Sequence, residues 1–324
     1  MVATVFIDGE SGTTGLQIRQ RLEGRNDLAV ASIDAAQRKD PARRAEMMND
    51  ADAVILCLPD DAARDAVGLI RNNRTRVIDA STAHRTTEGW TYGFPEMTVG
   101  QRAAIAGAGR VSNPGCYATG AIALLRPLVS RGVLPAGWPV TINAVSGYSG
   151  GGKALIAAFE DAGSPQATHD TFRLYAMGVV QKHIDEIQMY SALEGRPLFI
   201  PSIGRFAQGM LVSVPLQLWA IPGKPKLDAL HAALAEHYAG EHYIDVEPLE
   251  ETLAIGLASS LDPRNPEPEG LNDTNRMTLS VFGNPEHEQA VLLAKLDNLG
   301  KGASGQAVQN LNLMLGLEET ASLP

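Results

Sequence analysis

A glycine-rich turn near the start of the chain constrains its fold more than any other feature. Residues 2–7 form an apolar run that is typical of a buried strand, and a helical pattern follows through about Leu22. Gly9, Gly12 and Gly15 lie between the two. In dinucleotide-binding folds, glycine at this turn lets backbone N–H groups approach a pyrophosphate. The spacing is not the strict GxGxxG pattern, and a tight turn without a ligand is the alternative interpretation.

The alternation of strand and helix continues through the first part of the chain. Further strands are predicted at residues 28–33, 53–58 and 76–79, with helices at 42–49 and 62–70 between them. Strands that alternate with helices form an open parallel sheet with right-handed crossovers. This part of the chain is therefore predicted to be an α/β, Rossmann-like domain.

The pattern changes in the second part of the chain. Longer alternating strands are predicted at residues 139–145 and 211–218, and residues 204–218 and 278–282 look antiparallel. Residues 227–238 have the pattern of an amphipathic helix. We therefore expect an α+β domain with a mixed, largely antiparallel sheet after the first domain.

The remaining segments near the C-terminus are predicted from composition and periodicity. Residues 262–272 are rich in proline and acidic residues and indicate a surface loop. Residues 288–317 are predicted to be helical again, with a glycine-rich interruption at 300–305.

Composition excludes several classes of function. The chain has 324 residues, enough for two domains, and its net charge of −10 argues against a nucleic acid as partner. The two cysteines, Cys57 and Cys116, imply no disulfide framework, so a reducing, cytoplasmic location is expected. The start lacks the basic region of a secretory signal, and no apolar stretch is long enough to span a bilayer, so no membrane partner is expected.

Cys116 is the most reactive candidate in the sequence. It follows Asn113-Pro114-Gly115 and begins a run with helical periodicity. The free N–H groups and the positive dipole end of a helix start favour an anion, so this thiol is expected to ionise readily to the nucleophilic thiolate. A small, buried, structural cysteine is the alternative.

A thiol nucleophile needs a nearby base that takes its proton and later returns one. Seven histidines are available for this role, and the residues alone do not choose among them. They are His84, His169, His183, His231, His237, His242 and His287.

Charged residues after the second strand bear on the cofactor. Asp34 is placed where an acid could bind a ribose 2′-hydroxyl, as in NAD, whereas Arg38 and Lys39 could hold the 2′-phosphate of NADP. Arg43 and Arg44 add to the positive charge of this segment. We favour NADP(H), and solvated surface charge is the alternative.

Two further segments are candidates for anion binding. Residues 146–153 are rich in glycine and end in Lys153, so they form either a flexible loop or a set of N–H groups aimed at an anionic substrate. Arg85 follows the fourth predicted strand, at the sheet edge where open α/β sheets bind ligands. It is a candidate phosphate anchor, with an ordinary surface arginine as the alternative.

Taken together, these features make the chain resemble the N-acetyl-gamma-glutamyl-phosphate reductases, in their shorter form, over nearly its whole length. The string Asn113-Pro114-Gly115-Cys116-Tyr117 is the most specific part of the resemblance. The other matching segments are shared more widely with aspartate-semialdehyde dehydrogenases. The segments that carry the resemblance are residues 9–15, 78–81, 113–117, 146–153, 182–187 and 302–310.

The resemblance implies roles for individual residues. It makes Cys116 the nucleophile and His183 the acid and base, and it requires no metal. It also implies that a C-terminal helix returns to the first domain. The dinucleotide-binding domain is then predicted at residues 1–113 with 295–324, and the catalytic and oligomerisation domain at 114–294. Cofactor contacts are expected from Gly9, Ser11, Gly12, Thr13, Thr14, Gly15, Arg38, Lys39, Ser81 and Asn312, and substrate contacts from Arg85, Asn113, Tyr117, Ser149, Gly150, Lys153 and Lys182.

The implied reaction is the NADPH-dependent reduction of an N-acetylglutamyl phosphate, a small-molecule acyl phosphate, to its semialdehyde through a cysteine thioester. An aspartate-semialdehyde dehydrogenase is one alternative, although the arginine that those enzymes place seven residues before the histidine is Ala176 here. A non-catalytic sensor of NADP or of redox state is the other. The resemblance also implies a homo-oligomer, either a dimer or a tetramer.

Overall fold

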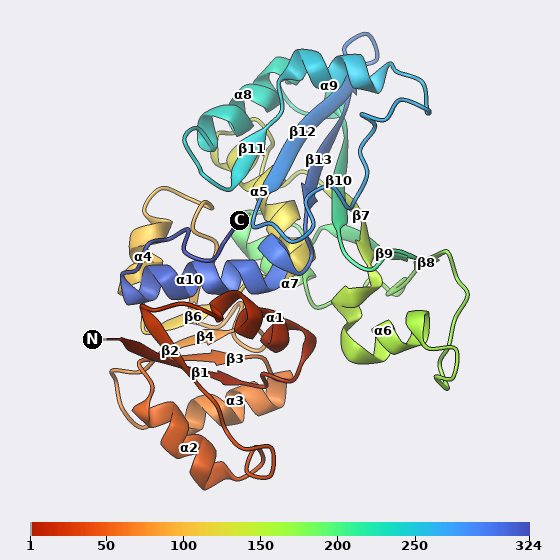
Figure 1. Ribbon diagram of the computed structural model, residues 1–324. Coiled ribbons are helices and arrows are strands. Elements are labelled where there is room, and N and C mark those ends of the chain that lie inside the picture. The colour runs from red at the N-terminus through yellow and green to blue at the C-terminus, as the bar shows by residue number, and fades with distance from the viewer. Residues whose placement is uncertain (1) are drawn as a thin grey trace. The chain divides into compact units, whose positions relative to one another are not determined.

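The computed structural model describes residues 2–324 and separates into two compact units. The first consists of Met1–Gly115 with Ala303–Pro324, and the second of Cys116–Gly302. Figure 1 follows the chain through both units and shows its C-terminal helix lying among the helices of the first unit. The predicted functional division, with its boundaries at 1–113, 114–294 and 295–324, stays a prediction.

The first unit is built on a parallel sheet of six strands in the order β2-β1-β3-β4-β6-β5. Because the strand order reverses at β1, the carboxyl ends of β1 and β3 form the edge where folds of this kind bind ligands. The strands are β1 (Ala3–Asp8), β2 (Leu28–Ala31), β3 (Ala53–Leu56), β4 (Arg76–Asp79), β5 (Thr91–Tyr92) and β6 (Arg110–Ser112).

Helices cover both faces of this sheet. α10 packs against α1 and α4 on one face, and α2 packs against α3 on the other (Figure 1). Apolar side chains such as Phe6, Met48 and Val54 form a core between the sheet and the second pair. The predicted Rossmann-like domain is confirmed. The helices are α1 (Thr13–Leu22), α2 (Pro41–Asp50), α3 (Asp60–Leu69), α4 (Gln101–Gly107) and α10 (Gly305–Leu315).

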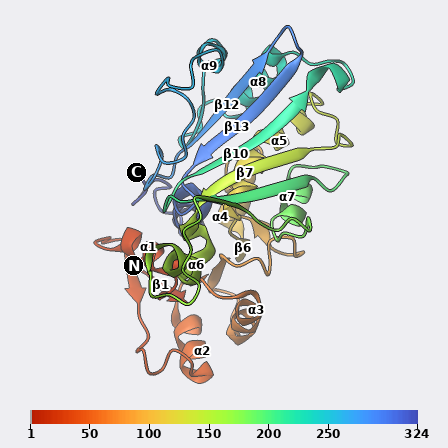
Figure 2. The same cartoon turned by 90° about the vertical axis from the view of Figure 1, so that its right-hand side faces the viewer.

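The second unit contains a mixed sheet of seven strands in the order β11-β12-β13-β10-β7-β9-β8. Only the β7–β9 and β11–β12 pairs are parallel, which confirms the predicted mixed, largely antiparallel sheet. Figure 2 shows its central strands side by side. The strands are β7 (Thr141–Gly147), β8 (Phe172–Leu174), β9 (Leu198–Gly204), β10 (Met210–Gln217), β11 (Ile244–Val246), β12 (Met277–Asn284) and β13 (Gln289–Leu296).

The helix that begins at Cys116 is the centre of the second unit. It packs on β10 and β13, with α7 and α8 beside it, and most of its residues are buried. Its apolar sequence predicts such a position, since a helix that is apolar all round must be covered on every side. The helices are α5 (Cys116–Ser130), α6 (Gly152–Glu160), α7 (Ile184–Tyr190), α8 (Leu227–His237) and α9 (Leu249–Gly256), with a short 3-10 turn η1 (Tyr148–Gly151).

The prediction of helix over residues 288–317 is wrong in its first part. Residues 289–296 form β13, which pairs with β10 on one side and β12 on the other. The next residues form a π-helical turn, η3 (Gly300–Ser304), and only then does α10 begin. Alanine, leucine and lysine favour a helix in isolation. Here the hydrogen bonds to β10 and β12 make residues 289–296 a strand instead.

Candidate functional site

The glycine-rich turn is held by very close backbone contacts. Gly9 has a φ of +88°, and a Cβ atom there would lie 2.3 Å from the carbonyl oxygen of Cys57, at the end of β3. A Cβ atom on Gly15 would lie 2.5 Å from the carbonyl oxygen of Gly9. Because any side chain would push these segments apart, both positions require glycine.

The start of α1 is arranged to receive an anion. Its N-cap residue is Gly12, whose N–H donates to the carbonyl oxygen of Gly9 at 2.9 Å and which has no side chain to cap the helix. Thr13 and Thr14 form the first turn, and neither they nor Ser11 are buried. N–H groups at such a helix end favour a phosphate.

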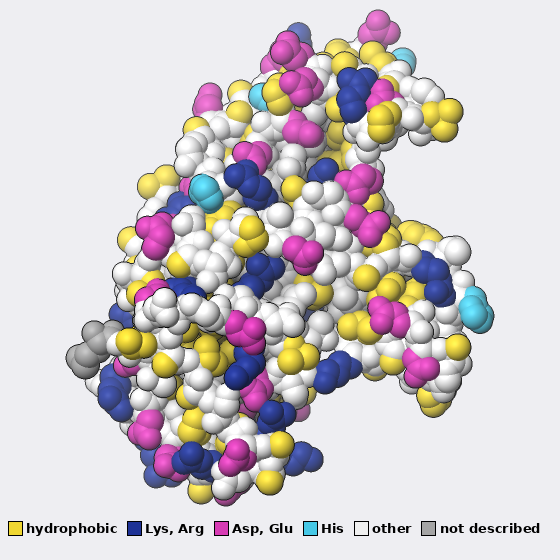
Figure 3. Space-filling model, viewed as in Figure 1, with side chains coloured by type: hydrophobic (Ala, Val, Ile, Leu, Met, Phe, Trp, Pro, Cys, Tyr) yellow, Lys and Arg dark blue, Asp and Glu magenta, His cyan; other side chains and the backbone are white. Residues whose placement is uncertain are grey.

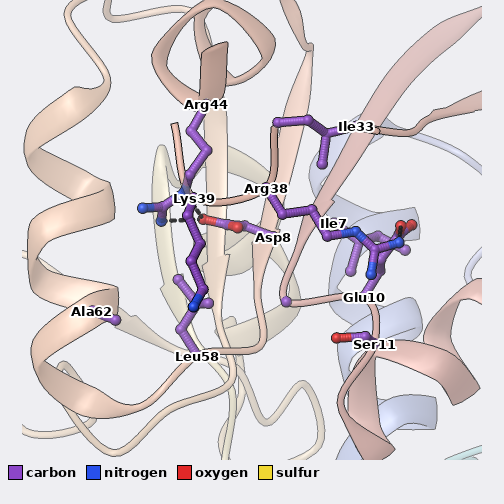
Figure 4. Close-up of a pocket in the computed structure, with 11 residues that line it drawn as sticks. Ile7, Asp8, Glu10, Ser11, Ile33, Arg38, Lys39, Arg44, Leu58 and Ala62 are labelled. Carbon is purple, nitrogen blue, oxygen red and sulfur yellow. Dashed lines mark hydrogen bonds and ion pairs between the residues drawn. The ribbon is translucent and has the colours of Figure 1, made fainter. Parts of the chain in front are cut away.

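A pocket of about 330 Å³ opens beside this turn, at the carboxyl ends of β1 and β3. Arg38 pairs with Glu10 at 2.8 Å and Arg44 with Asp8 at 2.5 Å, while Lys39 extends along the pocket toward Leu58 (Figure 4). Asp34 is not among the lining residues. They are Ile7, Asp8, Gly9, Glu10, Ser11, Ile33, Arg38, Lys39, Arg44, Leu58 and Ala62.

The loop after β4 is fixed by a buried carboxylate. Asp79 accepts hydrogen bonds from the N–H and the hydroxyl of Ser81, each at 2.8 Å, and lies 2.6 Å from Nδ1 of His84. Arg85 follows in the same loop, and its Nε donates to the carbonyl oxygen of Asn113 at 3.1 Å. Arg85 and Asn113 are both buried, so the predicted phosphate anchor lies against the segment that leads to the cysteine.

Cys116 is the first residue of α5 and is partly exposed. The chain passes very close to it at Gly302, where a Cβ atom would lie 2.8 Å from the Cβ of Cys116. Burial raises the pKa of both Tyr117 and Tyr175, and the charge of Cys116 adds to the rise in each case.

His183 is the N-cap residue of α7, which packs against α5. Its ring is 5% exposed and meets the ring of Tyr117 edge-on, with centroids 5.4 Å apart. The side chain of Gln181 lies against it, since Oε1 accepts from the His183 N–H at 2.6 Å. Cys116 and His183 therefore stand at the N-terminal ends of two packed helices within one unit.

The other predicted substrate residues differ in their exposure. Ser149 is buried, where its N–H donates to the carbonyl oxygen of Ala207 at 3.0 Å and its hydroxyl accepts from Asn298 at 3.1 Å. Gly150, Lys153 and Lys182 are exposed. Gly150, Lys153 and Lys182 can therefore contact a ligand directly, whereas the hydrogen bonds of Ser149 hold the loop after β7 in place.

Asn312 and Tyr117 also make hydrogen bonds within the protein. Asn312 accepts a hydrogen bond from Arg25 at 2.7 Å and donates to the carbonyl oxygens of Glu319 and Ala321, so it holds the C-terminal segment. The hydroxyl of Tyr117 donates to the carbonyl oxygen of Ser202 at 3.0 Å. The predicted contacts of Asn312 with the cofactor and of Tyr117 with the substrate stay predictions.

Sequence reasoning did not assign roles to Gln181, Tyr175 or Gly302. Gln181 lies two residues before His183, but only the fold shows that its amide turns back onto the ring. Gly302 lies in a matching segment, and its closeness to Cys116 joins residues far apart in the sequence. Along residues 2–324, none of the helices has the length and apolar character that a membrane span requires.

Two family models together cover most of the chain. Residues 4–108 match the semialdehyde dehydrogenase NAD binding domain, and residues 116–298 match the semialdehyde dehydrogenase dimerisation domain. The chain is also similar to solved structures. Aspartate semialdehyde dehydrogenase II from Vibrio cholerae superposes with a TM-score of 0.70 and 15% identity, over 98% of this chain and 99% of that one. At that identity the likeness shows the fold alone.

Relatives with known names are much more similar in sequence. The N-acetyl-gamma-glutamyl-phosphate reductase of Burkholderia lata is 54% identical over 98% of both chains. N-acetyl-gamma-glutamyl-phosphate reductase 2 of Pseudomonas putida is 53% identical over 96% of both. The enzyme of the same name from a Nostoc species is 50% identical over 98% of both.

Proposed function

This chain belongs to the N-acetyl-gamma-glutamyl-phosphate reductases of the semialdehyde dehydrogenase family, and on that premise we propose which of its residues perform the reaction. It reduces N-acetyl-L-glutamyl 5-phosphate to N-acetyl-L-glutamate 5-semialdehyde in arginine biosynthesis, with NADPH as reductant and phosphate as second product. The placement of Cys116 and His183 at the ends of packed helices carries the assignment of residues.

Cys116 is the nucleophile in this proposal. Its thiolate attacks the acyl-phosphate carbonyl, the S–C bond forms, the C–O bond to phosphate breaks, and phosphate leaves with the bonding electron pair. The N–H groups in the first turn of α5 are placed to stabilise negative charge that develops on the carbonyl oxygen. A thiol suits both halves of the reaction because it attacks well and later leaves well.

His183 moves the proton. It accepts the proton of the Cys116 thiol as the thiolate forms and returns a proton to the departing phosphate. Bound NADPH supplies the hydride that reduces the carbon of the resulting thioester. When the oxygen on that carbon re-forms the carbonyl, the S–C bond breaks and Cys116 is released as thiolate with the semialdehyde.

The cofactor is assigned to the first unit. The turn from Gly9 to Gly15 and the open start of α1 fit a pyrophosphate, and the basic pocket beside them fits a phosphorylated ribose. Arg38 and Lys39 are the proposed partners of the 2′-phosphate. The remaining proposed contacts are Ser11, Gly12, Thr13, Thr14 and Ser81.

The anionic substrate is assigned to the basic and polar groups that the sequence predicts for it. The guanidinium of Arg85 is the proposed phosphate partner, and Asn113 is its neighbour. Lys153, in the first turn of α6, and Lys182, beside His183, carry exposed ammonium groups that can meet a carboxylate or phosphate. Gly150 leaves its backbone open to the same ligand.

The decisive variant is Cys116→Ser. It should bind NADPH with unchanged affinity, measured by quenching of protein fluorescence, and should lose nearly all turnover. His183→Asn should lose a factor of roughly 10²–10⁴, the usual worth of acid–base catalysis. Cys57→Ala is the matched control and should keep its turnover. Full activity of the Cys116→Ser enzyme would remove the proposed mechanism.

An aspartate-semialdehyde dehydrogenase is the alternative interpretation of the sequence, and a comparison of substrates tests it. Phosphate-dependent oxidation of the two semialdehydes separates them. We expect N-acetylglutamate semialdehyde to be oxidised and aspartate semialdehyde not to be, in keeping with Ala176 seven residues before His183. The opposite preference would assign the aspartyl reaction.

We also propose a cytoplasmic homo-oligomer, a dimer or a tetramer, that binds no nucleic acid. The net charge of −10 supports the last point, and Figure 3 shows Lys and Arg side chains interspersed with Asp and Glu over the face in view. The match of residues 116–298 to a dimerisation domain supports self-association. The presence of only two cysteines supports a reducing compartment.

A further inference from the structure

We propose that Gln181 is a positioning residue that holds the Nδ1 edge of His183 in both of its protonation states and leaves Nε2 as the atom that exchanges the proton. The inference rests on the proposed role of His183 as acid and base, and it adds the device that lets this histidine change its charge without changing its orientation.

The orientation of the Gln181 amide follows from a backbone contact. The atom 2.6 Å from the His183 N–H is assigned as Oε1, and a backbone N–H can only donate, so an acceptor belongs there. With the amide oriented in this way, Nδ1 of the imidazole lies 2.9 Å from Oε1 and 2.7 Å from Nε2 of Gln181. Both a donor and an acceptor are therefore within hydrogen-bond distance of the same ring nitrogen.

This arrangement serves both forms of the imidazole. When the ring is neutral with its proton on Nε2, Nδ1 accepts a hydrogen bond from the Gln181 NH₂ group. When the ring is an imidazolium, Nδ1–H donates to Oε1. A carboxylate at position 181 could only accept, so it would favour the charged form. An amide holds the ring while favouring neither state by charge.

Two neutral tyrosines belong to this cluster. Tyr117 of α5 meets the His183 ring edge-on, and Tyr175 donates to the hydroxyl of Tyr117 at 3.3 Å and is hydrogen-bonded to Gln181. Burial raises the pKa of both phenols, so neither places a charge beside the histidine near neutral pH. The charge of Cys116 also contributes to raising the pKa of both phenols.

Two carboxylates lie in the first turn of α7. Glu186 is buried, three residues after His183, and its charge adds to the effect of burial in raising the pKa of Tyr190. Asp185 is exposed and pairs with Arg196 at 2.7 Å. The Gln181 amide lies against the Nδ1 edge of His183.

The backbone that connects Tyr175 to Gln181 is held in an uncommon conformation. Ala176 has a φ of +53° and Val179 a φ of +58°, both in the left-handed region that residues other than glycine rarely adopt. Such conformations persist where the surrounding contacts impose them, and they cluster at functional sites. Here Ala176 and Val179 lie in the sequence between Tyr175 and Gln181, the residue that contacts the histidine.

The test compares two substitutions by the pH dependence of kcat/KM. In the Gln181→Glu enzyme the acidic limb, which reports His183, should move to higher pH by about one unit or more, because the carboxylate favours the imidazolium. In the Gln181→Met enzyme kcat should fall about tenfold, because both hydrogen bonds are lost, with little change in the KM of the acyl phosphate. Gln188→Glu is the matched control on α7, where the amide donates to the Glu194 carbonyl oxygen, and it should leave the limb in place.

A double-mutant cycle separates positioning from packing. If Gln181 acts through His183, the Gln181→Met substitution should have almost no effect on kcat in a His183→Asn enzyme. If Gln181→Met lowers kcat about tenfold in the His183→Asn enzyme as well, the positioning role is overturned. The role is also overturned if the acidic limb of the pH profile of kcat/KM does not move in the Gln181→Glu enzyme. Near-normal activity of His183→Asn alone would instead remove the role of His183, so the two failures are distinguishable.

Discussion

At the residue scale, the two cysteines show how place decides chemistry. Cys57 follows β3 in the first unit and is partly exposed as a residue, but desolvation of its thiol and then the charges of Asp79 and Asp8 raise the pKa of that thiol to about 12. Cys116 is partly exposed at the start of a helix, where the N–H groups favour an anion. The same side chain is therefore inert at one position and a proposed nucleophile at the other.

Alkylation should distinguish the two thiols directly. At pH 7.5 iodoacetamide should add one label, at Cys116, because the raised pKa of Cys57 keeps that thiol protonated until the pH approaches about 12. Peptide mass spectrometry locates the label, and the Cys116→Ser enzyme should take up none. Equal labelling of the two cysteines at this pH would contradict the assignment.

The preference for NADPH over NADH is also expected to depend on single residues. Lys39→Ala should raise the KM for NADPH about tenfold and leave that for NADH unchanged, since a charged hydrogen bond to the 2′-phosphate is worth about 1.5–3 kcal/mol. Arg43→Ala is the matched control, because Arg43 pairs with Glu46 at 2.6 Å and does not line the pocket. Steady-state kinetics with both cofactors measure the effect. A parallel loss with NADH would argue against a contact to the 2′-phosphate.

At the scale of elements, two turns position the proposed chemistry. The glycine turn joins β1 to α1, and the Pro114-Gly115 turn leads from β6 to the start of α5. Both connect a strand to a helix whose first N–H groups are proposed to stabilise an anion. Local sequence was enough to predict both turns because glycine and proline restrict the backbone within a few residues.

Gly9, in the glycine turn, should tolerate substitution by alanine less well than Gly24, although both residues have a positive φ. Gly24→Ala should cost about 1–2 kcal/mol of unfolding free energy, since φ is +75° but nothing lies within 4 Å of the new Cβ. Gly9→Ala should cost more and should also weaken NADPH binding, because the Cβ would lie 2.3 Å from the Cys57 carbonyl oxygen. Urea unfolding and cofactor titration measure both effects. Equal costs would show that the close contact is easily relieved.

At the scale of the whole molecule, the sheet of the second unit has two unequal faces. In β13, Ala290, Leu292, Ala294 and Leu296 are buried on the face that carries α5, while Val291 on the opposite face is 39% exposed. Partly covered apolar residues at the centre of a sheet are typical of a surface that a second subunit covers. We propose this face as the site of self-association.

A charge at the centre of that face should weaken self-association. Val291 lies between Phe282 of β12 and Pro215 of β10, so Val291→Lys would place a charge inside the proposed interface. Sedimentation velocity should then show a shift toward the monomer. Leu261→Lys is the control, since Leu261 is 89% exposed in a loop, and it should sediment like the unchanged enzyme. If Val291→Lys sediments in the same way as Leu261→Lys and the unchanged enzyme, the interface lies elsewhere.

The nucleotide-binding turn, the parallel sheet around it and the placement of Cys116 at a helix start could all be predicted from the sequence. Each depends on signals within about ten residues, namely glycine and proline positions and the period of apolar residues. The prediction of His183 among seven histidines came from the resemblance rather than from the residues alone, since sequence order says nothing about which imidazole lies near a given thiol.

Tertiary contacts decided the rest. Residues 289–296 have helix-favouring composition but become a strand, because partners on both sides bury alternate side chains. Asn312 turns to the C-terminal segment, and Gln181 turns back onto His183. These outcomes depend on contacts between residues that are far apart in the sequence. Such hydrogen bonds and strand pairings produce no periodic pattern of residue types, so they could not be predicted from the sequence.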